Sequence, residues 1–244
     1  NYGLNLSTAN YSIANGFCTT ASANYSAVLS GCNNSAIGAF STIGGGQNNC
    51  ATGSNSFIGG GCGNRVTQLG GVIGGGCCNT SSGYYSGVFT GQCNCALVTT
   101  AVVVGGRCNT ASNYFNFLGA GRFNCVSGSG SALVGGRNHT ASGTYAFIGG
   151  GAINTSSGYN SMVAGGKQNN TSNNYTGVLA GRNNVVSNSD SGVAVGLNNS
   201  VIGVASFLGG GNCNCIVGSC AFVGGGEFNK AIGAYSGVLG GVSS

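Results

Sequence analysis

The chain has 244 residues, of which 51 are Gly and 13 are Cys, with one His and no Pro or Trp. Charged residues make up 4% of the sequence, against about 25% in an ordinary globular domain. Two acids and one His cannot supply the acid–base groups of most enzymes, so we expect a non-catalytic protein that uses no cofactor. The apolar fraction of 41% disfavours disorder, and the lack of Pro excludes collagen.

The net charge of +5 comes from seven basic and two acidic residues, which favours acidic partners only weakly. The longest apolar runs, such as residues 101–104 (AVVV), are too short to cross a bilayer, so no membrane span is expected. The sequence starts without Met and without a signal peptide. We therefore expect a processed chain or a segment of a longer one.

A glycine recurs at a fixed interval, at Gly16, Gly31, Gly46 and so on to Gly241, and we number the positions of the repeat 1 to 15 from this glycine. Position 4 is nearly always Asn, and position 13 is Val, Ile or Leu from Ile13 through Val238. A fixed short period indicates a solenoid, and the density of Gly excludes helices. The sequence therefore predicts an all-β, parallel β-solenoid of about 16 coils of 15 residues, as one repeat domain over residues 1–244.

Each coil has room for two short strands, at about positions 4–7 and 10–14. Gly or Asn at position 8, and Gly at positions 15 and 1, are expected to supply the positive φ of the two turns. Stacked coils place identical positions above one another. The Asn residues at position 4 are then expected to form a ladder in which each amide donates to the next. This ladder includes Asn34, Asn49, Asn64, Asn79, Asn94, Asn109 and Asn124.

Positions 12 and 14 should point out of the coil if position 13 points in, yet both are apolar. Every Phe at position 12 is followed by Gly at position 14, whereas Gly at position 12 is followed by a larger residue. Because close packing conserves volume, we expect this face to be buried against sister chains in a cyclic homotrimer, with a dimer as the alternative. The predicted interface residues are Phe57, Phe89, Phe117, Phe147, Leu179, Phe207, Phe222 and Leu239. The end coils carry no polar cap, so the alternatives are a segment of a longer chain or end-to-end stacking into a filament.

Residues 25–31 (YSAVLSG), 109–112 (NTAS) and 235–241 (YSGVLGG) resemble the head repeats of trimeric autotransporter adhesins. Similar repeats also occur in phage and virus fibres, and the resemblance covers essentially the whole chain. It implies a left-handed parallel β-roll with three chains to a rod. It also implies an extracellular location, on a cell or virion surface, and a role in extending a fibre or attaching it to host matrix components.

Cysteines at the same position of adjoining coils lie about 4.8 Å apart, within the Cα range of a disulfide. Disulfides are therefore feasible among Cys62, Cys77, Cys78, Cys93 and Cys108, with free thiols as the alternative. A metal site near Cys77, Cys78, Cys93 and Cys95 is a minor alternative on ligand type, and the sequence predicts no metal.

Five basic residues share position 2: Arg107, Arg122, Arg137, Lys167 and Arg182. They keep copies of the chain apart in solution or, alternatively, contact a glycan or polyanion. Nucleic acid is not expected, since charges about 4.8 Å apart do not follow phosphates about 3.4 Å apart. In a eukaryotic secretory route, glycans are expected at some Asn-x-Ser/Thr sequons, among them Asn24, Asn79, Asn138, Asn154 and Asn174.

These observations predict a structural fibre that extends from a surface, associates with itself and attaches to a host or other surface. The alternative is a module that binds glycans or polyanions through its basic residues. A lesser alternative is ice binding by the Thr and Ser residues at positions 5 and 7, although Cys, Arg, Lys and aliphatic residues interrupt that array.

Overall fold

The computed structural model describes residues 4–243, which contain 32 two-residue β-strands and no helix. The strands occupy positions 5–6 and 12–13 of each coil, so they are shorter than the sequence predicted. The chain forms two compact units, Asn1–Phe123 and Asn124–Ser244, and both carry the same repeat. All strand pairings within each unit are parallel, which confirms the predicted all-β parallel solenoid of about 16 turns.

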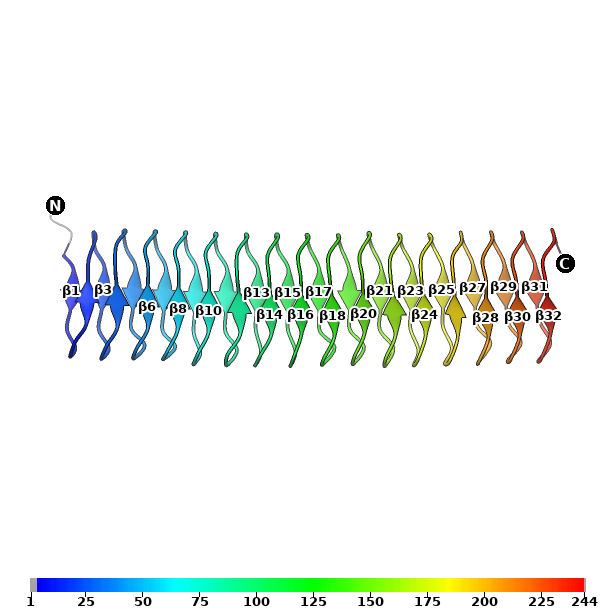
Figure 1. Ribbon diagram of the computed structural model, residues 1–244, viewed down its shortest axis with the longest axis horizontal. Helices are drawn as coiled ribbons and strands as arrows, with labels where there is room; N and C mark the ends of the chain where they lie inside the picture. Colours follow the sequence, from blue (N-terminus) through cyan, green and yellow to red (C-terminus); the bar gives the residue numbers. More distant parts are fainter. Residues whose placement is uncertain (1–3, 244) are drawn as a thin grey trace. The chain divides into compact units, whose positions relative to one another are not determined.

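In the first unit, the odd-numbered strands form one sheet and the even-numbered strands form a second (Figure 1). The odd-strand sheet contains β1 (Leu6–Ser7), β3 (Thr20–Ala21), β5 (Ser35–Ala36), β7 (Cys50–Ala51), β9 (Arg65–Val66), β11 (Thr80–Ser81), β13 (Cys95–Ala96) and β15 (Thr110–Ala111). The even-strand sheet contains β2 (Ile13–Ala14), β4 (Ala27–Val28), β6 (Thr42–Ile43), β8 (Phe57–Ile58), β10 (Val72–Ile73), β12 (Gly87–Val88), β14 (Val102–Val103) and β16 (Phe117–Leu118).

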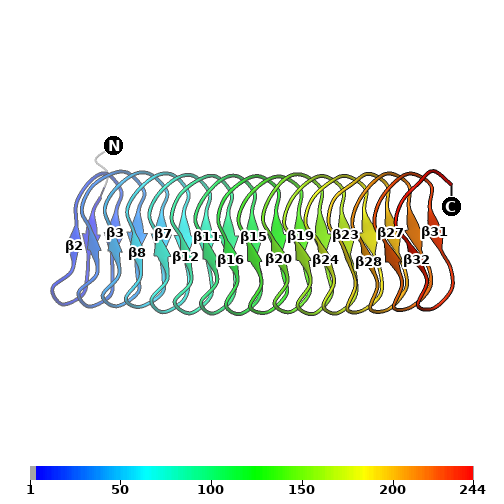
Figure 2. The same cartoon turned by 45° about the vertical axis from the view of Figure 1, so that its right-hand side comes forward.

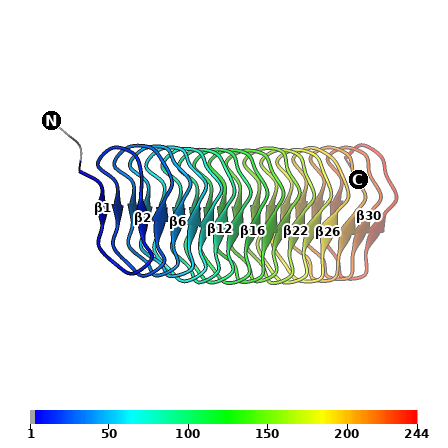
Figure 3. The ribbon, with the colours of Figure 1, turned by 60° about the vertical axis from the view of Figure 1, so that its left-hand side comes forward.

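The second unit repeats this arrangement. Its odd-strand sheet contains β17 (Cys125–Val126), β19 (Thr140–Ala141), β21 (Thr155–Ser156), β23 (Asn170–Thr171), β25 (Val185–Val186), β27 (Ser200–Val201), β29 (Cys215–Ile216) and β31 (Lys230–Ala231). Its even-strand sheet contains β18 (Ala132–Leu133), β20 (Phe147–Ile148), β22 (Met162–Val163), β24 (Gly177–Val178), β26 (Gly192–Val193), β28 (Phe207–Leu208), β30 (Phe222–Val223) and β32 (Gly237–Val238). In both units, arcs of chain connect the two sheets at each end of the coil (Figures 2 and 3).

The core lies between the two sheets of each unit. Residues at position 6, most of them small like Ala36 and some larger like Ile216, and aliphatic residues at position 13, such as Ile43, are fully buried between the sheets. Positions 4 and 11 add buried Asn and Ser side chains, such as Asn34 and Ser41. Each sheet therefore contributes one layer of side chains to the interior. Two of the four buried positions, 4 and 11, are mostly polar, and the other two, 6 and 13, are mostly apolar.

The first turn is shorter than the others by a single residue. Leu6 pairs with Thr20 and Ile13 pairs with Ala27, so Ile13 stands at position 12 and Ala14 at position 13. The assignment of Ile13 to the position-13 column was therefore wrong. Asn15 is followed directly by Gly16, which means that this turn lacks a residue at position 15.

The positions of the coil that have positive φ differ in part from those predicted. Gly at position 1 has positive φ throughout, for example +91° at Gly61, as predicted. Positions 8 and 15 do not; instead, positions 3 and 10 are left-handed, as at Cys78 (56°) and Tyr25 (59°). The Gly residues at position 8 serve close approach, because a Cβ on Gly38 would overlap the Gly53 backbone.

Candidate functional site

The outward side chains at positions 12 and 14 of the even-strand sheet form what we call the apolar face. No repeat places a charged residue at either position. The predicted interface residues all lie on this face; six of them are 41–54% exposed, Phe147 is less exposed and Leu239 is 89% exposed. In the described residues of one chain, about half of the surface of each of those six side chains stays exposed.

Three of the phenylalanine rings pack on glycines of their own coil. Phe57 Cε1 lies 3.5 Å from the place that a Cβ on Gly59 would take. The corresponding distance is 3.4 Å for Phe222 and Gly224. These rings therefore contact position 14 of their own coil at ordinary van der Waals distance. The expectation that the face is buried against sister chains stays a prediction, which rests on the volume pattern and on the exposed apolar area.

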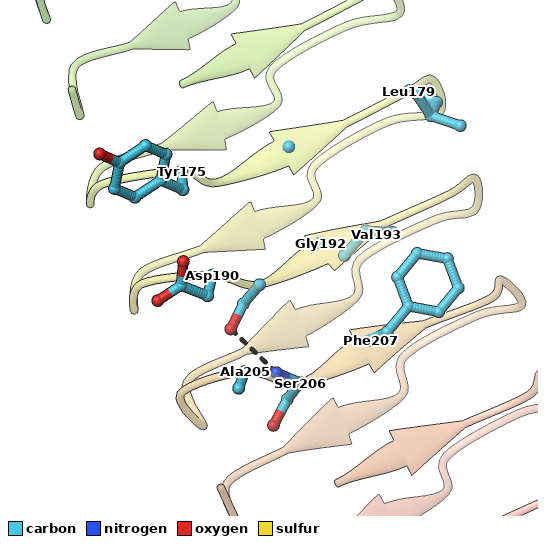
Figure 4. Close-up of a pocket in the computed structure, with 10 residues that line it drawn as sticks. Tyr175, Leu179, Asp190, Gly192, Val193, Ala205, Ser206 and Phe207 are labelled. Carbon is cyan, nitrogen blue, oxygen red and sulfur yellow. Dashed lines mark hydrogen bonds between the residues drawn. The ribbon is translucent and has the colours of Figure 1, made fainter. Parts of the chain in front are cut away.

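A shallow hollow of about 500 Å³ lies on the apolar face of the second unit. Its floor is made by Gly177 and Gly192, which pair in register, and a Cβ on Gly177 would meet nothing within 4 Å. Leu179 and Phe207 stand on one side, and Tyr175 and Asp190 on the other (Figure 4). The hollow offers no set of nucleophile, base and oxyanion donors, and it has the size and lining to receive an apolar side chain.

The Asn residues at position 4 form a ladder, but the amides bond to the backbone. Asn64 Oδ1 accepts the backbone N–H of Asn79 at 3.0 Å, and Asn64 Nδ2 donates to the carbonyls of Gly60 and Gly76, each at 2.9 Å. Amide-to-amide donation of the predicted kind occurs where Asn184 and Asn199 donate to the preceding rung. The backbone prevails because the turn carbonyls at positions 15 and 1 need donors inside the coil.

The predicted residues follow this scheme in each unit. In the first unit, the backbone N–H of each rung donates to the side-chain oxygen of the rung before it. The accepting oxygens are Oδ1 of Asn34, Asn49, Asn64, Asn79 and Asn94, and the last donor is the Asn109 N–H. In the second unit, Asn124 Oδ1 accepts the N–H of His139 at 3.0 Å. The ladder is buried throughout, which gives it a structural role.

His139 replaces Asn in this column and is 1% exposed. Its Nδ1 accepts the backbone N–H of Asn154 at 3.0 Å, so the neutral tautomer carries its proton on Nε2. Nε2 makes no hydrogen bond of good geometry among the described residues, although the backbone of Gly151 interacts with the imidazole and partly offsets the effect of burial on its pKa. Burial lowers the pKa of His139, because the charged form would lose its hydration.

Two of the predicted glycosylation sites belong to the ladder. Asn79 and Asn154 are fully buried, and each Nδ2 donates to two carbonyls. A glycan on either nitrogen is incompatible with this fold, so these two predictions were wrong. Asn24, Asn138 and Asn174 are exposed and stay predictions.

All 13 cysteines are free thiols, so the disulfides considered among Cys62, Cys77, Cys78, Cys93 and Cys108 are not formed. In-register parallel strands hold equivalent Cβ atoms about 4.8 Å apart, whereas a disulfide needs about 3.8 Å. The described residues contain no group of three or more His, Cys, Asp or Glu able to hold a metal ion. The minor alternative of a metal site with several ligands at Cys77, Cys78, Cys93 and Cys95 was therefore wrong.

The thiols nevertheless contact one another. Cys77 Sγ and Cys78 Sγ are 3.4 Å apart. Hydrogen bonding to Cys78, with burial and the neighbouring Cys62, raises the pKa of Cys77 to about 11. Burial raises the pKa of Cys93, to which the thiols of Cys108 and Cys78 contribute. These cysteines are therefore protonated at neutral pH.

The five basic residues at position 2 are all exposed. Arg107 and Arg122 are adjacent in the first unit, and the Arg122 guanidinium lies 5.5 Å from the centre of the Phe123 ring. In the second unit, Ala152 separates Arg137 from Lys167, which adjoins Arg182.

Sequence reasoning missed the stacking of aromatic rings at position 10. Tyr11 and Tyr25 stack with their ring centres 5.1 Å apart, and Tyr25 and Phe40 stack at 4.9 Å. Residues at this position are left-handed, and the three stacked rings are exposed at the corner of the coil. The signal was present in the sequence, since aromatic residues recur there in successive repeats.

No model of a known protein family matches the sequence, and no curated protein matches it either. Among residues 4–243, a helix able to span a membrane was not found.

Proposed function

We propose that this protein is a non-catalytic structural protein that forms a fibre by associating with copies of itself through the apolar face. The observation that carries the proposal is the exposure of uncharged, apolar side chains at positions 12 and 14 in coil after coil. Contiguous apolar surface of this kind marks an interaction site in soluble proteins.

A second copy of the chain is the partner that this face fits. The columns repeat at the spacing of the strands, about 4.8 Å, so a partner must carry the same period to match them over many coils. A sister chain has that period by construction. The glycine hollow between Leu179 and Phe207 can receive a phenylalanine of a neighbour, which would lock the register between chains.

Three copies around a common axis are the arrangement that we propose, in line with the resemblance to adhesin heads. The closed arrangement hides one apolar face per chain and leaves the polar odd-strand sheet outside. A fibre of this kind would serve at a cell or virion surface, where it extends and attaches to a host or other surface.

Native mass measurement tests this proposal. The wild-type chain of 23.7 kDa is expected at about 71 kDa, and Phe57→Lys/Phe207→Lys is expected to give monomers, since a buried lysine on the face is unfavourable. Ile37→Lys/Ile202→Lys adds the same charge at exposed aliphatic residues of position 7 and should remain trimeric. A wild-type monomer at micromolar concentration, or equal dissociation of both variants, would contradict the proposal.

Polyanion binding is the second candidate, favoured by the adjacent, exposed Arg107 and Arg122. Charge reversal of Arg107, Arg122 and Arg137 is expected to abolish retention on a sulfated glycan column without changing the oligomer. Unchanged retention would remove this candidate.

A further inference from the structure

Five cysteines gather at one corner of the first unit, where each coil turns from the even-strand sheet into the odd-strand sheet. Cys62 and Cys77 occupy position 2 of adjoining coils, and their backbones pair in register as an isolated parallel β-bridge. Cys78, Cys93 and Cys108 occupy position 3 of three successive coils, and all three are left-handed with φ between 54° and 56°. The corner therefore carries two short columns of thiols over four consecutive coils.

The two columns touch. Cys77 Sγ lies 3.4 Å from Cys78 Sγ, and Cys62 and Cys78 both perturb Cys77 electrostatically. Cys93 interacts with Cys78 on one side and Cys108 on the other. Cys62, Cys78 and Cys93 are exposed, so reagents and ions in solution can reach the cluster.

The repeat distance that prevents a disulfide suits a different cross-link. A Zn–S bond is about 2.3 Å long, and a linear bridge in which a cation binds two thiolates at a similar distance spans about 4.6 Å. Adjoining parallel strands are about 4.8 Å apart. The spacing of the coils therefore matches the span of one ion held by two thiols of the same column.

We propose that this cysteine corner binds soft monovalent d10 cations, Cu(I) or Ag(I), as linear bridges between thiols of adjoining coils. Thiolates select such ions, and two ligands satisfy them. Zinc in structural sites needs four ligands, and no group of three or more ligands is available among the described residues.

Each bridge forms two metal–sulfur bonds. The bridge between Cys62 and Cys77 takes one cation and releases two protons, which gives one bis-thiolate anion. The two bridges that share the Cys93 sulfur take two cations and release three protons in all, which gives a second anion of one negative charge. Arg107 directly precedes Cys108 and offers a positive charge to that anion. Three pairs are in place: Cys62 with Cys77, Cys78 with Cys93, and Cys93 with Cys108. Because each ion joins two coils, binding should also stabilise the stack.

Silver ion is the probe that tests this proposal on the full, reduced chain in chloride-free buffer. After a wash with a low concentration of a monothiol, native mass spectrometry should show three retained Ag(I) ions, and the melting temperature should rise by about 5 °C or more. Cys93→Ser should retain one ion, because it interrupts both bridges of the position-3 column.

Matched variants separate bridging from simple thiol binding. Replacing all five corner cysteines by Ser should abolish retention and the thermal shift. Replacing Cys18, Cys50, Cys125, Cys215 and Cys220, none of which has a cysteine at the same position of an adjoining coil, should leave both unchanged. Equal losses in the two variants, no thermal shift in the wild type, or stronger stabilisation by Zn(II) than by Ag(I) would overturn the proposal. Oligomer formation is measured separately, so this test stands apart from that of the fibre.

Discussion

Removing one rung of the Asn ladder tests how the polar half of the core stabilises each coil. In Asn64→Ala, three hydrogen bonds are lost: the Asn79 N–H loses its acceptor, and the carbonyls of Gly60 and Gly76 lose their donor. Each bond contributes about 1 kcal/mol net, and a buried N–H left without a partner adds about 1 kcal/mol or more. On the same basis, we expect the free energy of unfolding to fall by about 4 kcal/mol.

Urea unfolding followed by circular dichroism measures this loss, with Asn24→Ala as the control because Asn24 is exposed. Repeat arrays also open locally, so hydrogen exchange at the Asn79 amide gives a second, site-specific reading. Asn64→Asp keeps the acceptor but turns the donor into an oxygen that faces two carbonyls, and it should destabilise more than Ala at neutral pH. Equal stability of Asn64→Ala and Asn24→Ala would refute the reasoning.

Two further substitutions probe the same coil architecture. The pKa of His139 is lowered in the folded chain, so as the pH falls through the ordinary value of about 6.5 the unfolded chain takes up a proton before the folded chain does. The stability is therefore complete above that pH and decreases below it. His139→Asn should remove this pH dependence and raise the free energy of unfolding by about 1–2 kcal/mol through restored hydrogen bonds, which thermal melting at pH 7.5 and pH 5 will measure. In Gly61→Ala, a φ of +91° is combined with overlap between the new Cβ and the Gly76 carbonyl, so the free energy of unfolding in urea should fall by about 3 kcal/mol or more. Gly60→Ala is the control, because its Cβ would meet nothing closer than 3.9 Å, and it should change that free energy by no more than about 0.5 kcal/mol. Comparable effects of the two substitutions would contradict this account.

The period, the parallel stacking and the buried position-13 column could be read from the sequence because each recurs in nearly every coil. Val28 and Ile43 stand one period apart, and the strands pair them in that register. A one-residue shift would turn a whole column to the other face. The first turn escaped detection because Ile13 looks like a member of the column that Ala14 occupies.

The conformation of the turns could not be predicted from residue preferences alone. Gly at position 8 suggested positive φ, but the left-handed residues are at positions 3 and 10, where Cys78 and Tyr25 stand. Such residues adopt this conformation rarely on their own. Here the hydrogen bonds of the stack impose it: the Tyr25 N–H donates to the Asn10 carbonyl at 3.0 Å, and the Cys78 N–H donates to the Cys62 carbonyl at 2.8 Å.

The same constraint separates the positions that the fold fixes from those that are free to vary. Inside the coil, the Asn side chain, the glycine at position 1 and the aliphatic side chain at position 13 are each fixed by contacts that repeat in every turn. Outside, the backbone is equally regular but the side chains are free to vary, so Phe57, Arg65 and Cys78 can occupy neighbouring coils without disturbing the stack. We expect a column to bind a partner or an ion where residues of one chemical kind occur in adjoining coils. The thiols of the cysteine corner and the uncharged side chains of the apolar face are two such groups, and we propose to seek an ion at the first and a partner at the second.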